Sequence, residues 1–116
     1  MPKVSIYHNS RCSKSRQTLA LLEDNNCEVK IIEYLKTPLT VSEITDILTK
    51  LNIPPREMMR VKEPEYKELG LSDPTLTQEQ LIQAMINTPK LIERPIVLAN
   101  DKAVIGRPPE NVLTIL

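Results

Sequence analysis

The feature that most constrains the fold is a strand–helix–strand pattern in the first third of the chain. Val4–Tyr7 is a short apolar run that is typical of a buried strand. The helical run that begins with Gln17–Leu22 should end near Asp24, and Glu28–Tyr34 is again rich in β-branched residues. A helix between two strands at this spacing predicts a βαβ unit. Its strands should therefore be parallel and joined by a right-handed crossover.

The loop between the first strand and the helix, His8–Arg16, carries the strongest chemical signal. Cys12 lies where the helix starts, and the free N–H groups and positive dipole end of a helix start stabilise a thiolate. The loop also holds the only histidine of the chain and three basic residues, Arg11, Lys14 and Arg16. An isolated cysteine is more often a small buried hydrophobe, but a pocket lined by three bases is not apolar. We interpret Cys12 as a nucleophile.

Two capping-box patterns mark helix starts in the middle of the chain. Thr40 is followed three positions later by Glu43, and Thr77 by Gln80. The apolar residues that follow keep helical spacing in both segments: Val41, Ile44, Ile47, Leu48 and Leu51 in the first, and Leu81, Ile82, Met85 and Ile86 in the second, which should stop before Pro89. These patterns predict a helical block.

Between the two capped helices the pattern is weaker. Pro54–Arg60 can form a short helix that Pro64 interrupts. Glu65–Leu69 adds another turn, with Gly70 in the left-handed position that ends a helix.

The last third predicts a hairpin and a final helix. Two short strands, Arg94–Ala99 and Lys102–Gly106, flank a two-residue turn, and the final helix covers Asn111–Leu116 with proline at its start. The complete order is compatible with an α/β, thioredoxin-like fold, in which helices cover a mixed four-stranded sheet and a helical block is inserted. We expect residues 1–116 to form one domain.

Composition excludes several classes of function. The 15 acidic and 15 basic residues give a net charge of zero, which is not the balance of a nucleic-acid binder or of a protein held to anionic lipid by charge. No apolar run approaches the ~18 residues of a membrane span, and the N-terminus lacks a signal-peptide pattern. Two cysteines do not make a disulfide scaffold, which favours a reducing compartment, the cytoplasm. One histidine and two distant cysteines give no zinc spacing, so we expect no metal.

Five short motifs are spread in register over most of the chain. They are Ile6–Arg16, Met59-Arg60, Tyr66–Leu71, Glu93–Val97 and Gly106–Pro109. Together they closely resemble the glutathione- and glutaredoxin-coupled arsenate reductase family of the ArsC type. The end of the chain at Leu116 places it nearer a short branch of that family.

The resemblance assigns roles to individual residues. It implies that Cys12 is the nucleophile and that three arginines, Arg60, Arg94 and Arg107, bind the substrate. It also implies that four loop residues lower the pKa of the thiol, namely His8, Asn9, Ser15 and Arg16. The family fold is thioredoxin-like and has a cis peptide bond before the proline that matches Pro95. Taken singly, each arginine favours a structural role over a catalytic one, and the agreement of all three with the family reverses that.

The resemblance also implies a reaction and its partners. Arsenate is a tetrahedral oxyanion, and guanidinium groups bind such oxygens through paired, charge-assisted hydrogen bonds. The thiolate would attack arsenate, glutathione would attack next and release arsenite, and glutaredoxin would reduce the mixed disulfide. Glutathione is then a co-substrate and no cofactor is tightly bound. The family implies a monomer without nucleic-acid or membrane partners.

The second cysteine does not fit a resolving role. Ser15 occupies the second-cysteine position of a Cys-x-x-Cys motif, and a helix would separate Cys27 from Cys12 by ~15 Å. A disulfide needs Cα atoms within ~7 Å, so the reducing thiols must come from other molecules.

Two alternatives remain open. One is a transcriptional regulator of the same fold that binds RNA polymerase, although such relatives usually carry Cys-x-x-Cys and lack the full arginine set. The other is a glutathione-linked oxidoreductase that acts on another substrate.

Overall fold

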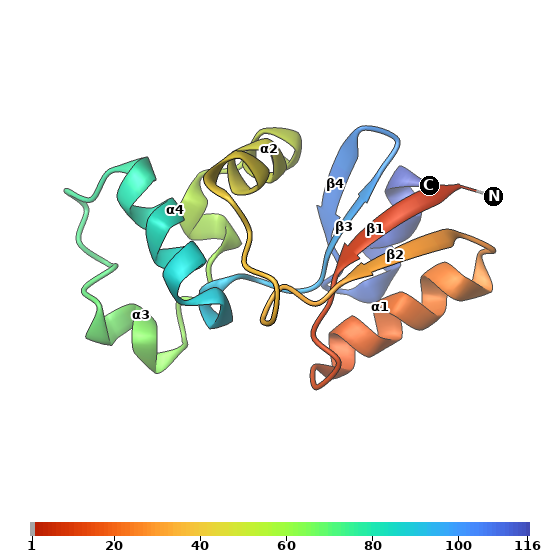
Figure 1. Ribbon diagram of the computed structural model, residues 1–116, viewed down its shortest axis with the longest axis horizontal. Helices are drawn as coiled ribbons and strands as arrows, with labels where there is room; N and C mark the ends of the chain where they lie inside the picture. The colour runs from red at the N-terminus through yellow and green to blue at the C-terminus, as the bar shows by residue number, and fades with distance from the viewer. Residues whose placement is uncertain (1) are drawn as a thin grey trace. The chain divides into compact units, whose positions relative to one another are not determined.

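A computed structural model describes residues 2–116, which divide into two compact units (Figure 1). The terminal unit combines the chain up to Thr37 with Arg94–Leu116. The inserted unit is Pro38–Glu93. Each is described by itself.

Within residues 2–116, the terminal unit holds one four-stranded sheet. Its strands are β1 (Lys3–Tyr7), β2 (Glu28–Ile32), β3 (Ile96–Ala99) and β4 (Lys102–Ile105), in the order β2-β1-β3-β4. β1 and β2 are parallel, and β3 is antiparallel to both of its neighbours. The helix α1 (Ser13–Asp24) connects the parallel pair, as the βαβ pattern predicts. The mixed sheet confirms the α/β, thioredoxin-like fold.

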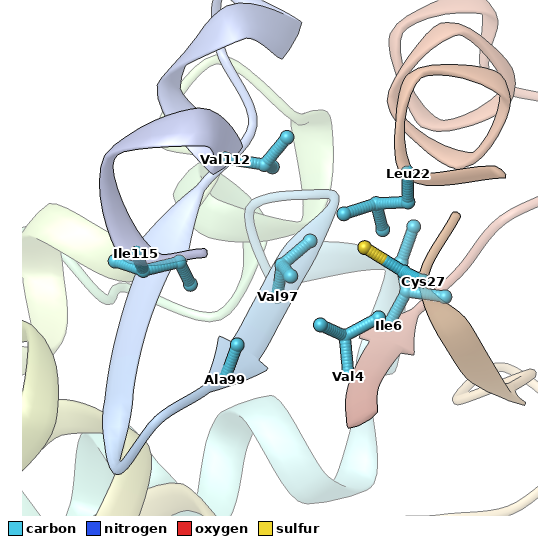
Figure 2. Packing of buried hydrophobic residues seen from close by; sticks show 8 residues of the cluster. All are labelled: Val4, Ile6, Leu22, Cys27, Val97, Ala99, Val112 and Ile115. Atoms are coloured by element: carbon cyan, nitrogen blue, oxygen red, sulfur yellow. The ribbon is translucent and has the colours of Figure 1, made fainter. Parts of the chain in front are cut away.

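One face of the sheet carries the core of this unit (Figure 2). Side chains alternate between faces along a strand, so every second residue of β1 and β3 contributes. These positions pack against α1, the residue before β2 and the 3₁₀ helix η3 (Pro109–Ile115). The cluster consists of Val4, Ile6, Leu22, Cys27, Val97, Ala99, Val112 and Ile115. α1 and η3 lie against each other over this core (Figure 1). Each fully buried aliphatic side chain stabilises the fold by about 1.5–3 kcal/mol.

The predicted hairpin is confirmed, whereas several element boundaries differ, including β3, which starts at Ile96, and β4, which ends at Ile105. Asn100 and Asp101 both have positive φ, at 53° and 60°, which is the conformation of a tight two-residue turn. β2 ends at Ile32 because the carbonyl of Glu33 accepts bonds from two later N–H groups and closes a turn. The last helix has proline at its start, as predicted, but it is a 3₁₀ helix that covers Pro109–Ile115 instead of 111–116.

The inserted unit is helical. Its elements are α2 (Val41–Leu51), η1 (Pro55–Met58), α3 (Pro64–Glu68), α4 (Gln78–Asn87) and η2 (Pro89–Leu91). Both predicted capping boxes are present. Thr40 Oγ1 accepts from the Glu43 N–H at 3.1 Å, Glu43 Oε1 accepts from the Thr40 N–H at 3.0 Å, and Thr77 and Gln80 repeat the exchange.

Three details of this unit differ from the sequence prediction. Val41 keeps helical spacing but is 49% exposed, so it lies outside the buried stripe. The short helix ends at Met58 instead of continuing to Arg60, because Met59 forms an antiparallel bridge with Ile92. Pro64 does not interrupt a helix but starts α3, where its missing N–H costs no hydrogen bond.

The bridge determines where two charged residues lie. The Arg60 N–H donates to the Leu91 carbonyl and the Glu93 N–H donates to the Met58 carbonyl, both at 2.7 Å. Arg60 and Glu93 therefore each lie next to a residue of the same β-bridge between two segments of the chain. No helix within 2–116 is long and apolar enough to span a membrane.

Candidate active site

Cys12 occupies the position immediately before α1. Its backbone is extended, with φ −93° and ψ 123°, and its carbonyl accepts the first helical bond from Arg16 at 3.0 Å. The Cys12 N–H donates to the Asn9 carbonyl at 3.0 Å, which closes the loop. The thiol thus stands where Ser, Thr or Asp usually caps a helix, with the N–H groups of the first turn directed at it.

The surroundings of the thiol favour its ionised form. Burial alone raises the pKa of the Cys12 thiol. The backbone N–H groups of Ser15 and Lys14 and the guanidinium of Arg94 act in the opposite direction and outweigh burial, so the pKa lies below that of an ordinary thiol. The partly exposed sulfur is therefore a suitable nucleophile.

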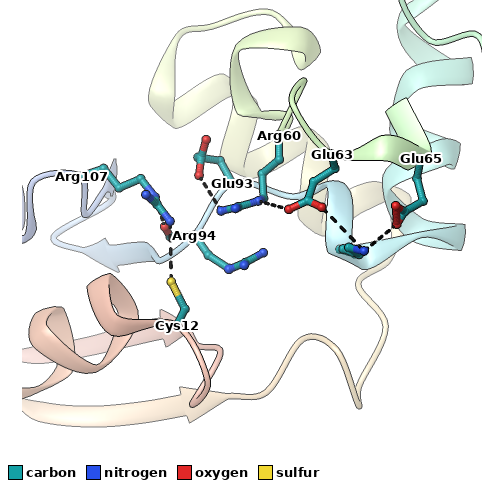
Figure 3. Close-up of polar contacts among 8 residues, drawn as sticks. Cys12, Arg60, Glu63, Glu65, Glu93, Arg94 and Arg107 are labelled. Carbon is teal, nitrogen blue, oxygen red and sulfur yellow. Dashed lines mark hydrogen bonds and ion pairs between the residues drawn. The ribbon is translucent and has the colours of Figure 1, made fainter. Parts of the chain in front are cut away.

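Two of the three predicted substrate-binding arginines come together at the thiol (Figure 3). Arg107 Nη2 lies 3.6 Å from Cys12 Sγ, and Arg107 Nε donates to the Arg94 carbonyl at 2.7 Å. Burial lowers the pKa of Arg94, but its contacts with Cys12 and with the fully buried Tyr34 raise it to above the usual value. The Arg94 guanidinium therefore stays charged beside the sulfur.

Both arginines precede prolines in cis peptide bonds. The bond between Arg94 and Pro95 is cis, as the resemblance implies. The bond between Arg107 and Pro108 is also cis, which the sequence did not predict.

The four predicted thiol-activating residues form hydrogen bonds that hold the His8–Arg16 loop in place. His8 Nδ1 and Ser15 Oγ share a buried 2.7 Å hydrogen bond, and Ser15 Oγ also accepts from the Asn9 N–H at 3.0 Å. Arg16 Nη1 donates to the Ser10 carbonyl at 2.9 Å. His8 thus contacts Ser15, whose own N–H faces the sulfur, and an effect of His8 on the thiol stays a prediction.

Histidine protonation is disfavoured inside this loop. Burial lowers the pKa of His8, Glu33 raises it, and Arg16 lowers it further, so that the net pKa lies below 6.5. A neutral imidazole can keep its bond with the Ser15 hydroxyl at neutral pH.

The third predicted arginine, Arg60, belongs to the inserted unit, so its approach to the thiol stays a prediction. Within its unit its guanidinium pairs with Glu63 and Glu93.

The other cysteine has a different environment. Cys27 packs in the aliphatic core, and burial raises the pKa of its thiol. In the part of the chain that the structure describes, neither cysteine is in a disulfide. The described residues also contain no cluster of three or more His, Cys, Asp or Glu side chains that could hold a metal.

Sequence reasoning missed the residues that support the arginine loops. Thr18 of α1 is fully buried, and its Oγ1 donates to the Lys14 carbonyl at 2.8 Å and lies 3.5 Å from the Gly106 carbonyl. Gly106 immediately precedes Arg107 and its N–H donates to the Pro95 carbonyl at 2.8 Å. The available signal was a hydroxyl on the apolar face of a helix.

Comparisons with known proteins identify the family of this chain. The profile of the ArsC family matches residues 7–115. A protein from Escherichia coli named "Uncharacterized protein YfgD" is 56% identical over 115 residues, which cover 98% of this chain and 97% of that protein. A Neisseria meningitidis protein named "Arsenate reductase" is 50% identical over the full length of both chains.

A solved structure is similar as well. The structure called "Arsenate reductase from Vibrio cholerae" has a TM-score of 0.97 and 51% identity, and the match covers 99% of this chain and 98% of that one. A family match over nearly all residues, with half of the positions identical in full-length relatives, establishes that this chain belongs to the ArsC family.

Proposed function

We propose that the protein is an arsenate reductase that uses Cys12 as its nucleophile and glutathione and glutaredoxin as its reductants. The observation that carries the proposal is the thiol of lowered pKa at the start of α1, with the guanidinium groups of Arg94 and Arg107 directed at it. Relatives of the same length that are named arsenate reductase support the choice of substrate.

The reaction uses each of these groups. The arginines Arg60, Arg94 and Arg107 would bind the arsenate oxygens and offset the repulsion between two anions, which is large in a poorly solvated site. The Cys12 thiolate attacks arsenic, forming an S–As bond and displacing one oxygen as water. Cys12 and glutathione then supply two electrons: a disulfide forms between them, As(V) becomes As(III), and arsenite leaves.

An external thiol is the appropriate reductant because the chain offers no second reactive one. Ser15 stands where a resolving cysteine would be, and Cys27 is buried in the core. Beside the loop lies a cavity of about 320 Å³ whose lining includes Arg11, Glu33 and Lys36. Charges of both signs suit a peptide that carries carboxylates and an ammonium group. The proposal accordingly places the protein in a reducing compartment, the cytoplasm.

The test is a coupled assay that follows NADPH oxidation with arsenate, glutathione, glutathione reductase and glutaredoxin. Wild type should show arsenate-dependent turnover and Cys12→Ser should show none. Cys27→Ser is the matched control, because it removes a thiol outside the loop. We expect Arg94→Ala to stay folded and to bind arsenate more weakly.

A folded wild type without turnover would contradict the proposal. It would favour an oxidoreductase acting on another substrate, or a regulator that binds RNA polymerase.

A further inference from the structure

Arg107 reaches the reactive thiol from an exposed position between β4 and η3, within the terminal unit (Figure 3). Its Nη2 lies 3.6 Å from Cys12 Sγ and its Nε donates to the Arg94 carbonyl at 2.7 Å, so the guanidinium end is held at the site. A long, exposed side chain loses much conformational entropy when it is fixed in this way. The place from which its backbone starts therefore affects how often the guanidinium reaches the sulfur.

One side chain of η3, Asn111, holds the backbone around Arg107. Its Nδ2 donates to the Arg107 carbonyl at 3.0 Å and to the Ile105 carbonyl at 3.3 Å. The Asn111 backbone N–H donates to the Pro108 carbonyl at 3.0 Å. Asn111 thus bonds three of the carbonyls in the segment 105–108, which carries the arginine.

A primary amide suits this position because it has two N–H donors, one for each of the two carbonyls that face Nδ2. The opposite orientation of the amide would place its oxygen against those carbonyl oxygens, which is repulsive. Arg107 is followed by two prolines, and a proline has no backbone N–H to donate. The half-buried asparagine side chain supplies donors that this part of the backbone lacks.

A second asparagine provides a comparison. Asn100, in the hairpin turn, donates from Nδ2 to the carbonyl of Ile115, the last residue of η3, at 2.8 Å. Both amides bond carbonyls at the ends of the same helix, one on each side. Of the two, Asn111 bonds the residue that contacts the Cys12 sulfur, so only its loss should reach the thiol.

We propose that Asn111 is a positioning residue, which holds the Arg107 loop so that the guanidinium lies beside the Cys12 sulfur and the oxyanion that this sulfur attacks. The inference rests on the proposed function where it takes Arg107 as an oxyanion ligand. The contact between Arg107 and the thiol is observed and does not depend on the substrate.

The experiment compares Asn111→Ala with the matched control Asn100→Gly. Each removes one amide beside η3, and glycine adopts the φ of 53° at residue 100 without strain. The pH dependence of Cys12 alkylation reports on the thiolate, and calorimetry gives the arsenate dissociation constant. Asn111→Ala should raise the alkylation midpoint and weaken arsenate binding about fivefold, the change in population that one ordinary hydrogen bond sustains. Asn100→Gly should change neither quantity.

A double-mutant cycle tests whether Asn111 acts through Arg107. In an Arg107→Ala background, Asn111→Ala should change neither quantity further. The same change in both backgrounds would overturn the inference, and so would an unchanged midpoint in Asn111→Ala or an equal shift in Asn100→Gly. If Asn111→Ala does not fold, Asn111→Ser, whose single donor cannot serve both carbonyls, must raise the midpoint instead, and an unchanged midpoint would overturn the inference.

The two readouts separate this inference from the proposed function. A midpoint that rises in Asn111→Ala, while wild type neither binds nor reduces arsenate, would support the positioning of Arg107 at the thiol and contradict the proposed function. An unchanged midpoint, together with arsenate turnover by wild type, would overturn the inference and leave the proposed function standing.

Discussion

Gly106 offers a direct test of how the terminal unit positions its arginines. It packs against α1 on one side and against Pro95 on the other. A Cβ added at Gly106 would lie 2.7 Å from Thr18 Oγ1, 2.9 Å from Pro95 Cγ and 3.1 Å from Thr18 Cγ2. The first two distances are shorter than real carbon contacts, so Gly106→Ala forces one of these neighbours to move.

Neither neighbour can move at low cost. The Pro95 ring is rigid, and the Thr18 side chain is β-branched, fully buried and bonded to the Lys14 carbonyl. Overpacking of this kind typically costs about 1–3 kcal/mol, so we expect Gly106→Ala to destabilise the protein by about 2 kcal/mol. For a chain of this size that corresponds to a fall in melting temperature of about 8 °C.

A double-mutant cycle identifies the contact. Thr18→Ala removes both atoms of Thr18 that the new Cβ would meet, so Gly106→Ala should cost about 1 kcal/mol less in that background. Calorimetric melting of wild type, both single variants and the double variant supplies the four values. A Gly106→Ala protein as stable as wild type, or strictly additive effects, would refute the packing argument.

Three further predictions concern titration and the second thiol. An ordinary thiol has a pKa of about 8.5, and the alkylation rate of Cys12 should have its pH midpoint below that value. Arg107→Ala should move the midpoint upward, because a cation 3.6 Å from the sulfur is lost. Cys27→Ser should keep arsenate turnover, since that thiol lies in the core, and a folded but inactive variant would show that it is the resolving thiol. Burial depresses the pKa of His8, so on acidification the unfolded chain binds the proton first. The stability that His8 contributes above pH 6.5 should therefore fall as the pH drops through the folded pKa. In urea titrations, His8→Gln should lose this dependence of the unfolding free energy on pH.

Local signals predicted the fold where one short segment contained all the information. The capping boxes at Thr40 and Thr77 and the turn at Asn100-Asp101 depend on neighbouring residues only, and all three form as expected. The end of β2 depended on a turn that begins at Glu33, inside the apolar run, and periodicity carries no sign of it. The 3₁₀ form of the last helix likewise has no distinct periodic signature over seven residues.

The candidate site likewise combines local features, which the sequence predicted, with long-range contacts, which it did not. Cys12 was identified from its own loop, because a helix start and adjacent bases are local features. Arg107 is 95 positions away from Cys12, and Gly106 is 88 positions from Thr18, so no local pattern connects either pair. The arginines were assigned only through family resemblance. The two carboxylates on Arg60 were not foreseen either, and Glu93 is 33 positions away from Arg60 in the sequence.

The site depends on the shape of arginine as well as on its charge. Arg107 contacts the Arg94 carbonyl through Nε and Cys12 Sγ through Nη2, so one planar group ties a backbone loop to the reactive sulfur. A lysine ammonium is a single point of charge and cannot make both contacts at that separation. The same planar group lets Arg60 meet two carboxylates through different nitrogens. Charge alone would not fix these contacts, whereas the spacing of the nitrogens within one planar group does.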